Sequence, residues 1–101
     1  MPAVARCGTD NITTGHPCTA SALIQGANQS SVYIEGSKAA IQGDAILVHT
    51  ILIGDNCVNH ASVINAGSSK VFIGGTPIAR TGDSADLGAI SSGSGKVSAG
   101  G

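Results

Sequence analysis

One segment of this chain occurs twice, and that repeat limits what the chain can fold into. Residues 31–44 (SVYIEGSKAAIQGD) align without a gap on residues 70–83 (KVFIGGTPIARTGD). Each copy starts with an alternating apolar piece, continues through a glycine turn and an alanine-containing piece, and ends on Gly-Asp. Alternation followed by a glycine turn is typical of two short antiparallel strands. The repeat therefore predicts a β-hairpin that is used twice.

Partial copies of the same unit stand at the two ends of the chain. Residues 4–10 resemble the returning strand, with one extra residue before the aspartate, and residues 93–101 resemble the outgoing strand that starts at Gly67. A fixed repeat is typical of stacked or closed architectures. We therefore predict one all-β domain over residues 1–101, with pseudo-threefold symmetry and units at about 2–36, 37–75 and 76–101. A generic small β-solenoid is the simpler alternative.

The sequence contains no amphipathic pattern for a helix longer than a turn or two. Residues 45–53 (AILVHTILI) are the best candidate for a short helix. However, their valine, isoleucine and threonine also suit a strand, because β-branched side chains pack well on a pleated surface. The sequence does not decide between a short helix and a strand for this segment.

The composition predicts that the core alone is a weak source of stability. Of 101 residues, 15 are glycine and only 2% are aromatic. Small domains of this kind usually need disulfides, a metal or an oligomeric partner. Three cysteines cannot all pair within one chain, and cytosolic synthesis disfavours stable disulfides. Three histidines beside three cysteines therefore indicate a bound metal.

Charge and hydropathy exclude several classes of function. The formal charge is −1 and charged residues make up 11% of the chain, which gives no field for nucleic acid, and base-stacking aromatics are nearly absent. No apolar run approaches the roughly 20 residues of a transmembrane helix. The N-terminus lacks the basic start and apolar stretch of a secretory signal peptide. We expect a protein made in the cytoplasm that neither binds nucleic acid nor anchors in a membrane.

The Gly-Asp pairs have a structural explanation. Each glycine is expected to take an unusual backbone angle and each aspartate to cap the following turn, at positions 43–44 and 82–83. Arg6 and Arg80 are expected to brace these corners by pairing with Asp10 and Asp83.

The segment Thr76-Pro77-Ile78-Ala79-Arg80-Thr81-Gly82-Asp83 is close to a Pro-Ala-Ala-Arg motif followed by Gly-Asp. With the Gly-Ser-x-x-Val strand starts and the early Gly-His, the chain resembles the PAAR-repeat family, the spike tips of contractile phage tails and type VI secretion systems. Ile78 replaces the second motif residue, and the middle copy lacks the proline and the arginine. The resemblance implies a small all-β cone on the blunt end of a trimeric β-helical spike, with a zinc ion at its vertex held by three histidines and one cysteine. It also implies a bare tip without a fused toxin domain.

Zinc prefers four nitrogen or sulfur ligands in a tetrahedron. Two candidates, His16 and Cys18, fall in the first predicted loop, where an extended His-Pro-Cys segment directs both side chains to one side. The second predicted loop holds His49 and a Cys-x-x-His turn, Cys57 to His60.

The identity of the fourth ligand stays open. Cys57 and Cys18 rank nearly equal, and Asp86 ranks third because a carboxylate also binds zinc and because it lies four residues before Ile90, as His60 lies before Ile64. Cys7 falls in a predicted strand and is expected to be a small buried residue. With four protein ligands the zinc would be structural, without an open position for catalysis.

The resemblance and the metal together predict a non-enzymatic function. We expect a membrane-piercing tip that caps a trimeric spike, one tip per trimer, contacts the target envelope transiently, and resides at a virion tail tip or leaves the cell through a contractile apparatus. The expected docking face lies around apolar residues of the hairpins, namely Val32, Ile34, Val71, Ile73 and Val97. The alternatives are a small zinc-dependent hydrolase, for which no His-Glu-x-x-His helix or paired carboxylate is found, and a free-standing binding module.

Overall fold

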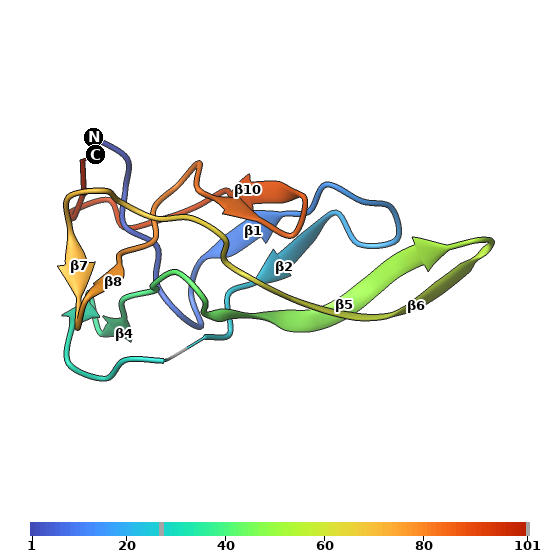
Figure 1. Cartoon of the computed structure of the whole chain (residues 1–101), viewed down its shortest axis with the longest axis horizontal. Helices are drawn as coiled ribbons and strands as arrows, with labels where there is room; N and C mark the ends of the chain where they lie inside the picture. The colour runs from blue at the N-terminus through green and yellow to red at the C-terminus, as the bar shows by residue number, and fades with distance from the viewer. Residues whose placement is uncertain (27, 101) are drawn as a thin grey trace.

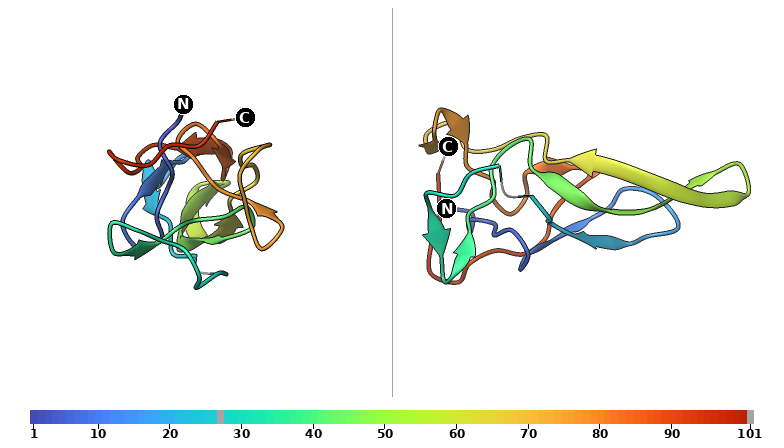
Figure 2. Two further views of the ribbon diagram at one scale, coloured as in Figure 1. Left: turned by 90° about the vertical axis from the view of Figure 1, so that its left-hand side faces the viewer. Right: turned by 90° about the horizontal axis from the view of Figure 1, so that it is seen from below.

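The computed structural model describes residues 1–26 and 28–100, and this part of the chain is all-β without a helix. The molecule is elongated, with extents of 41 × 23 × 23 Å (Figure 1). Both termini lie at the broad end, and a long hairpin forms the opposite end (Figures 1 and 2). The strands are β1 (Asn11–Thr13), β2 (Ser21–Leu23), β3 (Tyr33–Ile34), β4 (Ser37–Lys38), β5 (Ala45–Ile53), β6 (Asn56–Val63), β7 (Phe72–Ile73), β8 (Thr76–Pro77), β9 (Ser84–Ala85) and β10 (Gly88–Ile90).

Three alanines at equivalent repeat positions close a ring of backbone hydrogen bonds. The amide of Ala5 donates to the carbonyl of Ala79 at 3.0 Å, that of Ala79 donates to Ala40 at 2.9 Å, and that of Ala40 donates to Ala5 at 2.9 Å. All three residues have no exposed surface. A cyclic set of three identical bonds is what a pseudo-threefold axis through the chain requires.

The three hairpins around this ring are also equivalent. β3 pairs with β4 and β7 pairs with β8, each across a tight turn. The third hairpin joins the two ends of the chain, where Ala3 pairs with Ser98 and the amide of Val4 donates to the carbonyl of Val97 at 2.9 Å. This joining of the ends places both termini at the broad end.

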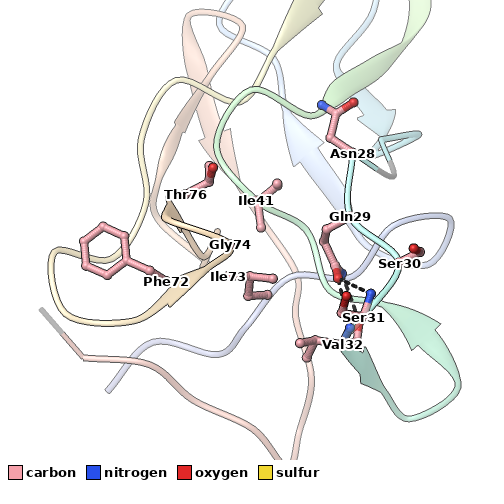
Figure 3. Close-up of a pocket in the computed structure, with 10 residues that line it drawn as sticks. All are labelled: Asn28, Gln29, Ser30, Ser31, Val32, Ile41, Phe72, Ile73, Gly74 and Thr76. Carbon is pink, nitrogen blue, oxygen red and sulfur yellow. Dashed lines mark hydrogen bonds between the residues drawn. The ribbon is translucent and has the colours of Figure 1, made fainter.

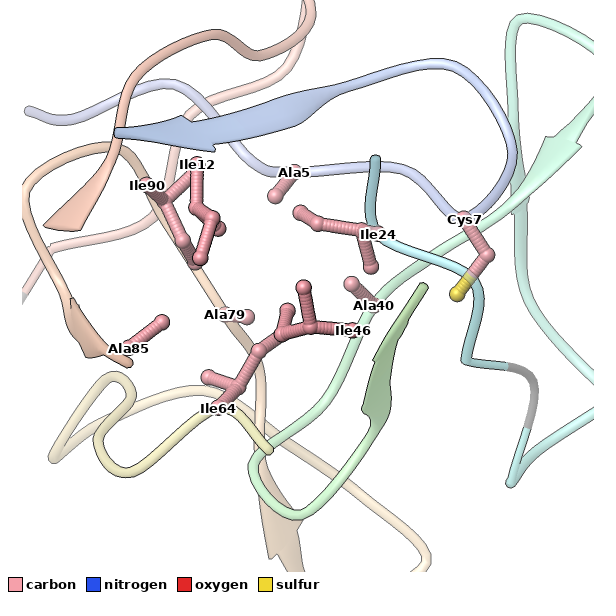
Figure 4. Packing of buried hydrophobic residues seen from close by; sticks show 10 residues of the cluster. All are labelled: Ala5, Cys7, Ile12, Ile24, Ala40, Ile46, Ile64, Ala79, Ala85 and Ile90. Carbon is pink, nitrogen blue, oxygen red and sulfur yellow. The ribbon is translucent and has the colours of Figure 1, made fainter. Parts of the chain in front are cut away.

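A second layer of pairings lies between this ring and the hairpin end. Its three antiparallel contacts each join two different units: Ile12 with Ile90, Ile24 with Ile46, and Ile64 with Ala85. These side chains point into one buried cluster (Figure 4). The four-stranded sheet runs in the order β2-β1-β10-β9, so the first and third units share a sheet. The core formed by these side chains is thin, and it contains residues of all three units around the axis.

Three aspartates fix the corners of the repeat, but each closes the turn that precedes it and not the following turn that the sequence predicted for Asp44 and Asp83. Asp10, Asp44 and Asp83 each accept a hydrogen bond from a backbone amide three or four residues earlier, at 2.8–2.9 Å. The first corner spans four residues because it carries the extra residue. Gly43 and Gly82 have φ values of 91° and 88°, which side chains disfavour.

Arginine braces two of these corners, which confirms the predicted pairs. The Arg6 guanidinium lies 2.8 Å from Asp10, and that of Arg80 lies 2.9 Å from Asp83. The middle corner has no arginine; there the sulfur of Cys7 lies 3.4 Å from the Asp44 carboxylate. Cys7 is buried, as expected.

Residues 45–53, for which the sequence left helix and strand open, form strand β5. It pairs with β6 in a long two-stranded hairpin that extends past every other element (Figures 1 and 2). Beyond the pair His49–His60 the ladder continues through four more pairs, from Thr50–Asn59 to Ile53–Asn56. At about 3.3 Å per residue, the hairpin continues about 13 Å past the histidines.

Ile34 is not on an exposed face, so its prediction as a docking residue is wrong. Ile34 is 5% exposed and packs with Val4, Ala39, Ile78 and Ala99 in a second buried cluster. Strand alternation explains this, because the neighbour Tyr33 points outward and is exposed.

Among the described residues, no helix is long and apolar enough to cross a membrane.

Candidate metal centre

Three histidines and one aspartate from all three units meet near the narrow end of the molecule. The Nε2 atoms of His16 and His60 each lie 2.7 Å from an oxygen of the Asp86 carboxylate, and Nε2 of His49 lies 2.5 Å from it. One ligand atom from each of the four residues lies within 4.8 Å of all the others. The three imidazole centroids are 5.2 Å apart in every pair.

Strand register places two of the histidines. His49 on β5 and His60 on β6 are directly paired, so their side chains leave the hairpin on the same face. The hairpin thus supplies two adjacent nitrogen ligands.

A strained turn places the carboxylate. Asp86 and Leu87 connect β9 to β10 with φ values of 48° and 63°, in the left-handed region that only glycine adopts freely. Aspartate tolerates this conformation better than most residues, whereas leucine does not. The Asp86 side chain is only 2% exposed, while Leu87 is 76% exposed. Backbone strain at a buried carboxylate is typical of a functional position.

Close backbone packing places His16. The amide of Gly15 donates to the carbonyl of Asp86 at 3.1 Å. A Cβ atom on Gly15 would lie 1.9 Å from the carbonyl oxygen of Leu87, and one on Gly88 would lie 1.8 Å from that of Thr13. The loop therefore rests on the turn only because both positions are glycine, and this contact brings His16 to Asp86.

The hydrogen bonds of the outer ring nitrogens determine what the inner ones can do. Nδ1 of His16 lies 3.0 Å from the carbonyl oxygen of Pro17, and Nδ1 of His49 lies 2.7 Å from that of Leu47. A carbonyl oxygen only accepts, so both Nδ1 atoms carry a proton. In the neutral rings, both Nε2 atoms then present lone pairs to the Asp86 carboxylate. They also present lone pairs to each other, because the two Nε2 atoms are 3.3 Å apart. A positive charge between these atoms removes the repulsion, and it can be a proton on the rings or a metal ion. A backbone carbonyl on the second nitrogen is the usual support for a metal-bound histidine.

The electrostatics of the cluster favour a positive charge. Burial raises the pKa of Asp86, but hydrogen bonds with His60, His16 and His49 outweigh this, so the pKa lies below its ordinary value of 3.8. The pKa of His16 lies above 6.5, mainly because its ring donates to the Pro17 carbonyl. Desolvation lowers this pKa, and the adjacent Asp86 raises it further. Asp86 is thus an anion at neutral pH. The donor set of three imidazoles and one carboxylate fits a structural metal ion.

Neither predicted cysteine belongs to this cluster. Cys18 and Cys57 are joined to each other in a disulfide, with Cα atoms 5.9 Å apart. The expected fourth ligand is therefore corrected from cysteine to Asp86, and the prediction that the cysteines avoid a disulfide is wrong for this pair.

Backbone geometry explains why the cysteines point elsewhere. Cys18 has a φ of 81°, so the His16–Cys18 segment is not extended and its side chains do not alternate as predicted. Cys57 and His60 both lie on β6, where a spacing of three residues places them on opposite faces.

A comparison with known protein families identifies this architecture. The PAAR motif matches the chain over residues 14–91. The chain belongs to the PAAR-motif family. No curated protein matches the chain.

The PAAR motif has a physical role in this fold. Pro77 ends the short strand β8, and Ala79 sits in the closed ring of backbone bonds, where it has no exposed surface. Arg80 binds both carboxylate oxygens of Asp83 at 2.9 and 3.0 Å. The motif thus builds the centre and one corner of the PAAR fold, and the candidate metal cluster stands at its narrow end.

Proposed function

We propose that this protein is the tip of the trimeric β-helical spike of a contractile injection machine, one tip per trimer. The main support for the proposal is the ring of backbone hydrogen bonds among Ala5, Ala40 and Ala79, which gives a single chain a threefold arrangement of hairpins. A chain with internal threefold symmetry can meet a true trimer with three equivalent contacts. Membership of the PAAR-motif family supports the same function.

The broad end has the properties of a docking face. It exposes apolar side chains from all three hairpins, namely Val32, Tyr33, Val71, Phe72 and Val97. A pocket of about 600 Å³ lies between residues 28–32, which precede β3, and the β7–β8 hairpin (Figure 3). Its lining is mixed, with apolar Val32, Ile41, Phe72 and Ile73 and polar Asn28, Gln29, Ser30, Ser31 and Thr76. Exposed apolar patches on a small protein are typical of binding sites.

The narrow end has the properties of a penetrating element. No lysine or arginine lies between Lys38 and Lys70, the segment that contains the β5–β6 hairpin. Leu52 and Ile53 are exposed at its end. A hairpin without lysine and arginine avoids the cost of taking ammonium or guanidinium groups out of water when it contacts a lipid envelope, although its turn carries one carboxylate, that of Asp55.

We propose zinc as the ion at the cluster of His16, His49, His60 and Asp86. Zinc binds histidine nitrogen and carboxylate oxygen, and a site filled by four protein ligands stabilises the fold without an open position for chemistry. Its binding free energy then becomes folding free energy. The ion would hold together a narrow end that is built from loops and one hairpin.

The docking proposal is tested by binding to a trimeric β-helical spike protein of the same machine. Light scattering of the mixture should give one chain per trimer. The double variant V71D/V97D places charges on two of the three hairpins and should abolish binding, while its metal content stays unchanged. The matched control L52D/I53D carries the same charges at the opposite end and should bind normally. Undiminished binding of V71D/V97D would contradict the proposed face.

A further inference from the structure

The disulfide joins two of the three elements that carry the candidate metal ligands. Cys18 lies in the loop after β1 that carries His16, and Cys57 lies on β6, which carries His60. The two cysteines are 39 positions apart in the chain. The amide of Thr50 donates to the hydroxyl of Thr19 at 3.1 Å, and the two hydroxyls are hydrogen-bonded at 3.0 Å, which connects the same loop to β5.

Both cysteines are within reach of small thiols. Cys18 and Cys57 are exposed, whereas the third cysteine, Cys7, is only 9% exposed. Thiol–disulfide exchange requires access of an attacking thiolate to a sulfur atom. The Cys18–Cys57 bond is therefore accessible to exchange in the folded protein, while Cys7 is shielded by the core.

We propose that Cys18 and Cys57 form a redox site that controls the affinity of the metal centre. With the bond closed, the loop is fixed against the hairpin and His16 is held beside His49 and Asp86. With the bond open, the loop must be ordered when the metal binds, and that ordering lowers the affinity. The inference rests on the metal centre of the proposed function and adds its regulation.

The redox step needs an oxidant, and glutathione disulfide is sufficient. The thiolate of one cysteine attacks a sulfur of glutathione disulfide and releases one glutathione thiolate, which leaves a mixed disulfide on the protein. The second cysteine then attacks the protein sulfur of the mixed disulfide and releases the second glutathione. Two electrons pass from the cysteine pair to glutathione, and the two protons of the cysteines pass to the released thiolates.

Thermodynamic linkage makes the effect reciprocal. If closing the bond raises metal affinity by a given factor, bound metal must favour the closed bond by the same factor. We expect a factor of roughly 10–100, within the usual range for coupled sites. A factor of 10 corresponds to a midpoint potential about 30 mV more negative when metal is bound. A chain made under reducing conditions would then tighten its metal centre on reaching an oxidising environment.

The test measures zinc affinity, by competition with a chromophoric chelator, for the oxidised full-length protein, the protein reduced with a phosphine, and the variant C18S/C57S. The expected result is a dissociation constant 10- to 100-fold higher for the reduced protein and for C18S/C57S, which should agree with each other. Equal dissociation constants for these two forms would show that the effect comes from loss of the disulfide, because C18S/C57S has no thiols at these positions that could bind zinc directly. Protection of Cys7 from alkylation, read by mass spectrometry, reports that each form remains folded.

A second measurement checks the reciprocal effect without any variant. The fraction of closed Cys18–Cys57 bond is measured against the ratio of glutathione to glutathione disulfide, with zinc and with a chelator. The midpoint should shift by the same factor as the affinity. Equal zinc affinity in the oxidised and reduced forms would overturn the linkage and leave the metal centre intact. Absence of zinc binding in every form would overturn both.

Discussion

Asp86 and His49 lie 37 positions apart in the chain, yet the carboxylate of one is 2.5 Å from Nε2 of the other. They belong to different units of the repeat and share no strand pairing. What unites them is the fold's threefold arrangement, which directs the hairpin of the second unit and the turn of the third toward the same point. The candidate metal centre is therefore a product of the whole fold and not of a local motif.

Removing the negative charge of Asp86 should weaken the metal centre. D86N keeps the size of the side chain but gives the ion a neutral ligand, and we expect zinc affinity to fall about 10- to 100-fold, as for lost supporting groups at metal sites. D86C supplies a thiolate, which is itself a good zinc ligand, and should recover most of the affinity. Chelator competition measures both variants. Equal affinity of D86N and wild type would contradict a ligand role for Asp86.

Removing the metal should destabilise the whole molecule. A ligand present at about 1,000 times its dissociation constant adds about 4 kcal/mol of stability. For a domain of this size that corresponds to a fall in Tm of roughly 15–30 °C on chelation. Circular dichroism melts with chelator, and then with zinc restored, measure the effect. A Tm that does not respond to the chelator would rule out a structural ion.

Gly88 should tolerate no side chain, because a Cβ there would lie 1.8 Å from the Thr13 carbonyl oxygen. G88A should separate the loop from the Asp86 turn and lower the free energy of unfolding by more than about 2 kcal/mol. The matched control is G95A, since no atom lies within 4 Å of a Cβ at that position. Urea unfolding of both variants gives the comparison. Equal stability of the two would show that the close packing is unimportant.

The Arg6–Asp10 corner should give stability that is lost in acid. Burial raises the pKa of Asp10, but hydrogen bonds with Arg6 and Ser92 outweigh it and the pKa lies below 3.8. A lowered pKa means that the ionised carboxylate is favoured in the folded state, so its contribution is complete above pH 3.8 and disappears as the pH falls through the lower folded value. The stability difference between wild type and D10N, both metal-free, should be constant from pH 5 to pH 8 and should shrink below about pH 4.

A third protein, R6M, identifies the cause of this pH dependence. Without the arginine, D10N should have a much smaller effect, and R6M/D10N should resemble R6M. If the difference between wild type and D10N also shrinks between pH 8 and pH 5, a group other than Asp10 controls it.

Much of the fold could be predicted because the repeat preserves what the backbone needs. The Gly-Asp corners, the arginine braces and the paired hairpins depend on local spacing, and the structure has them where the sequence indicates. The first unit is harder to see, because Gln29 replaces the serine found at Ser68 and Ser94. Its Oε1 accepts hydrogen bonds from the amides of Ser31 and Val32, as those serines do for their own strands. A longer side chain thus performs the same role, and residue identity conceals it.

The metal centre could be predicted only in part, for reasons of backbone geometry. The three histidines come together, but the fourth position of the cluster belongs to Asp86, which the sequence ranked behind both cysteines. Its four-residue spacing before Ile90, matching that of His60 before Ile64, was the available indication. The left-handed φ of Cys18 could not be read from the sequence, and it is this angle that removes the cysteine from the cluster.

The most direct test of the account is the metal content of the purified chain, measured by elemental mass spectrometry together with protein concentration. We predict one zinc ion per chain in the wild type and almost none in H49A/D86N, with the Cys18–Cys57 bond present in both. A wild-type protein that is folded and free of metal, or a variant that retains a full equivalent of zinc, would contradict it.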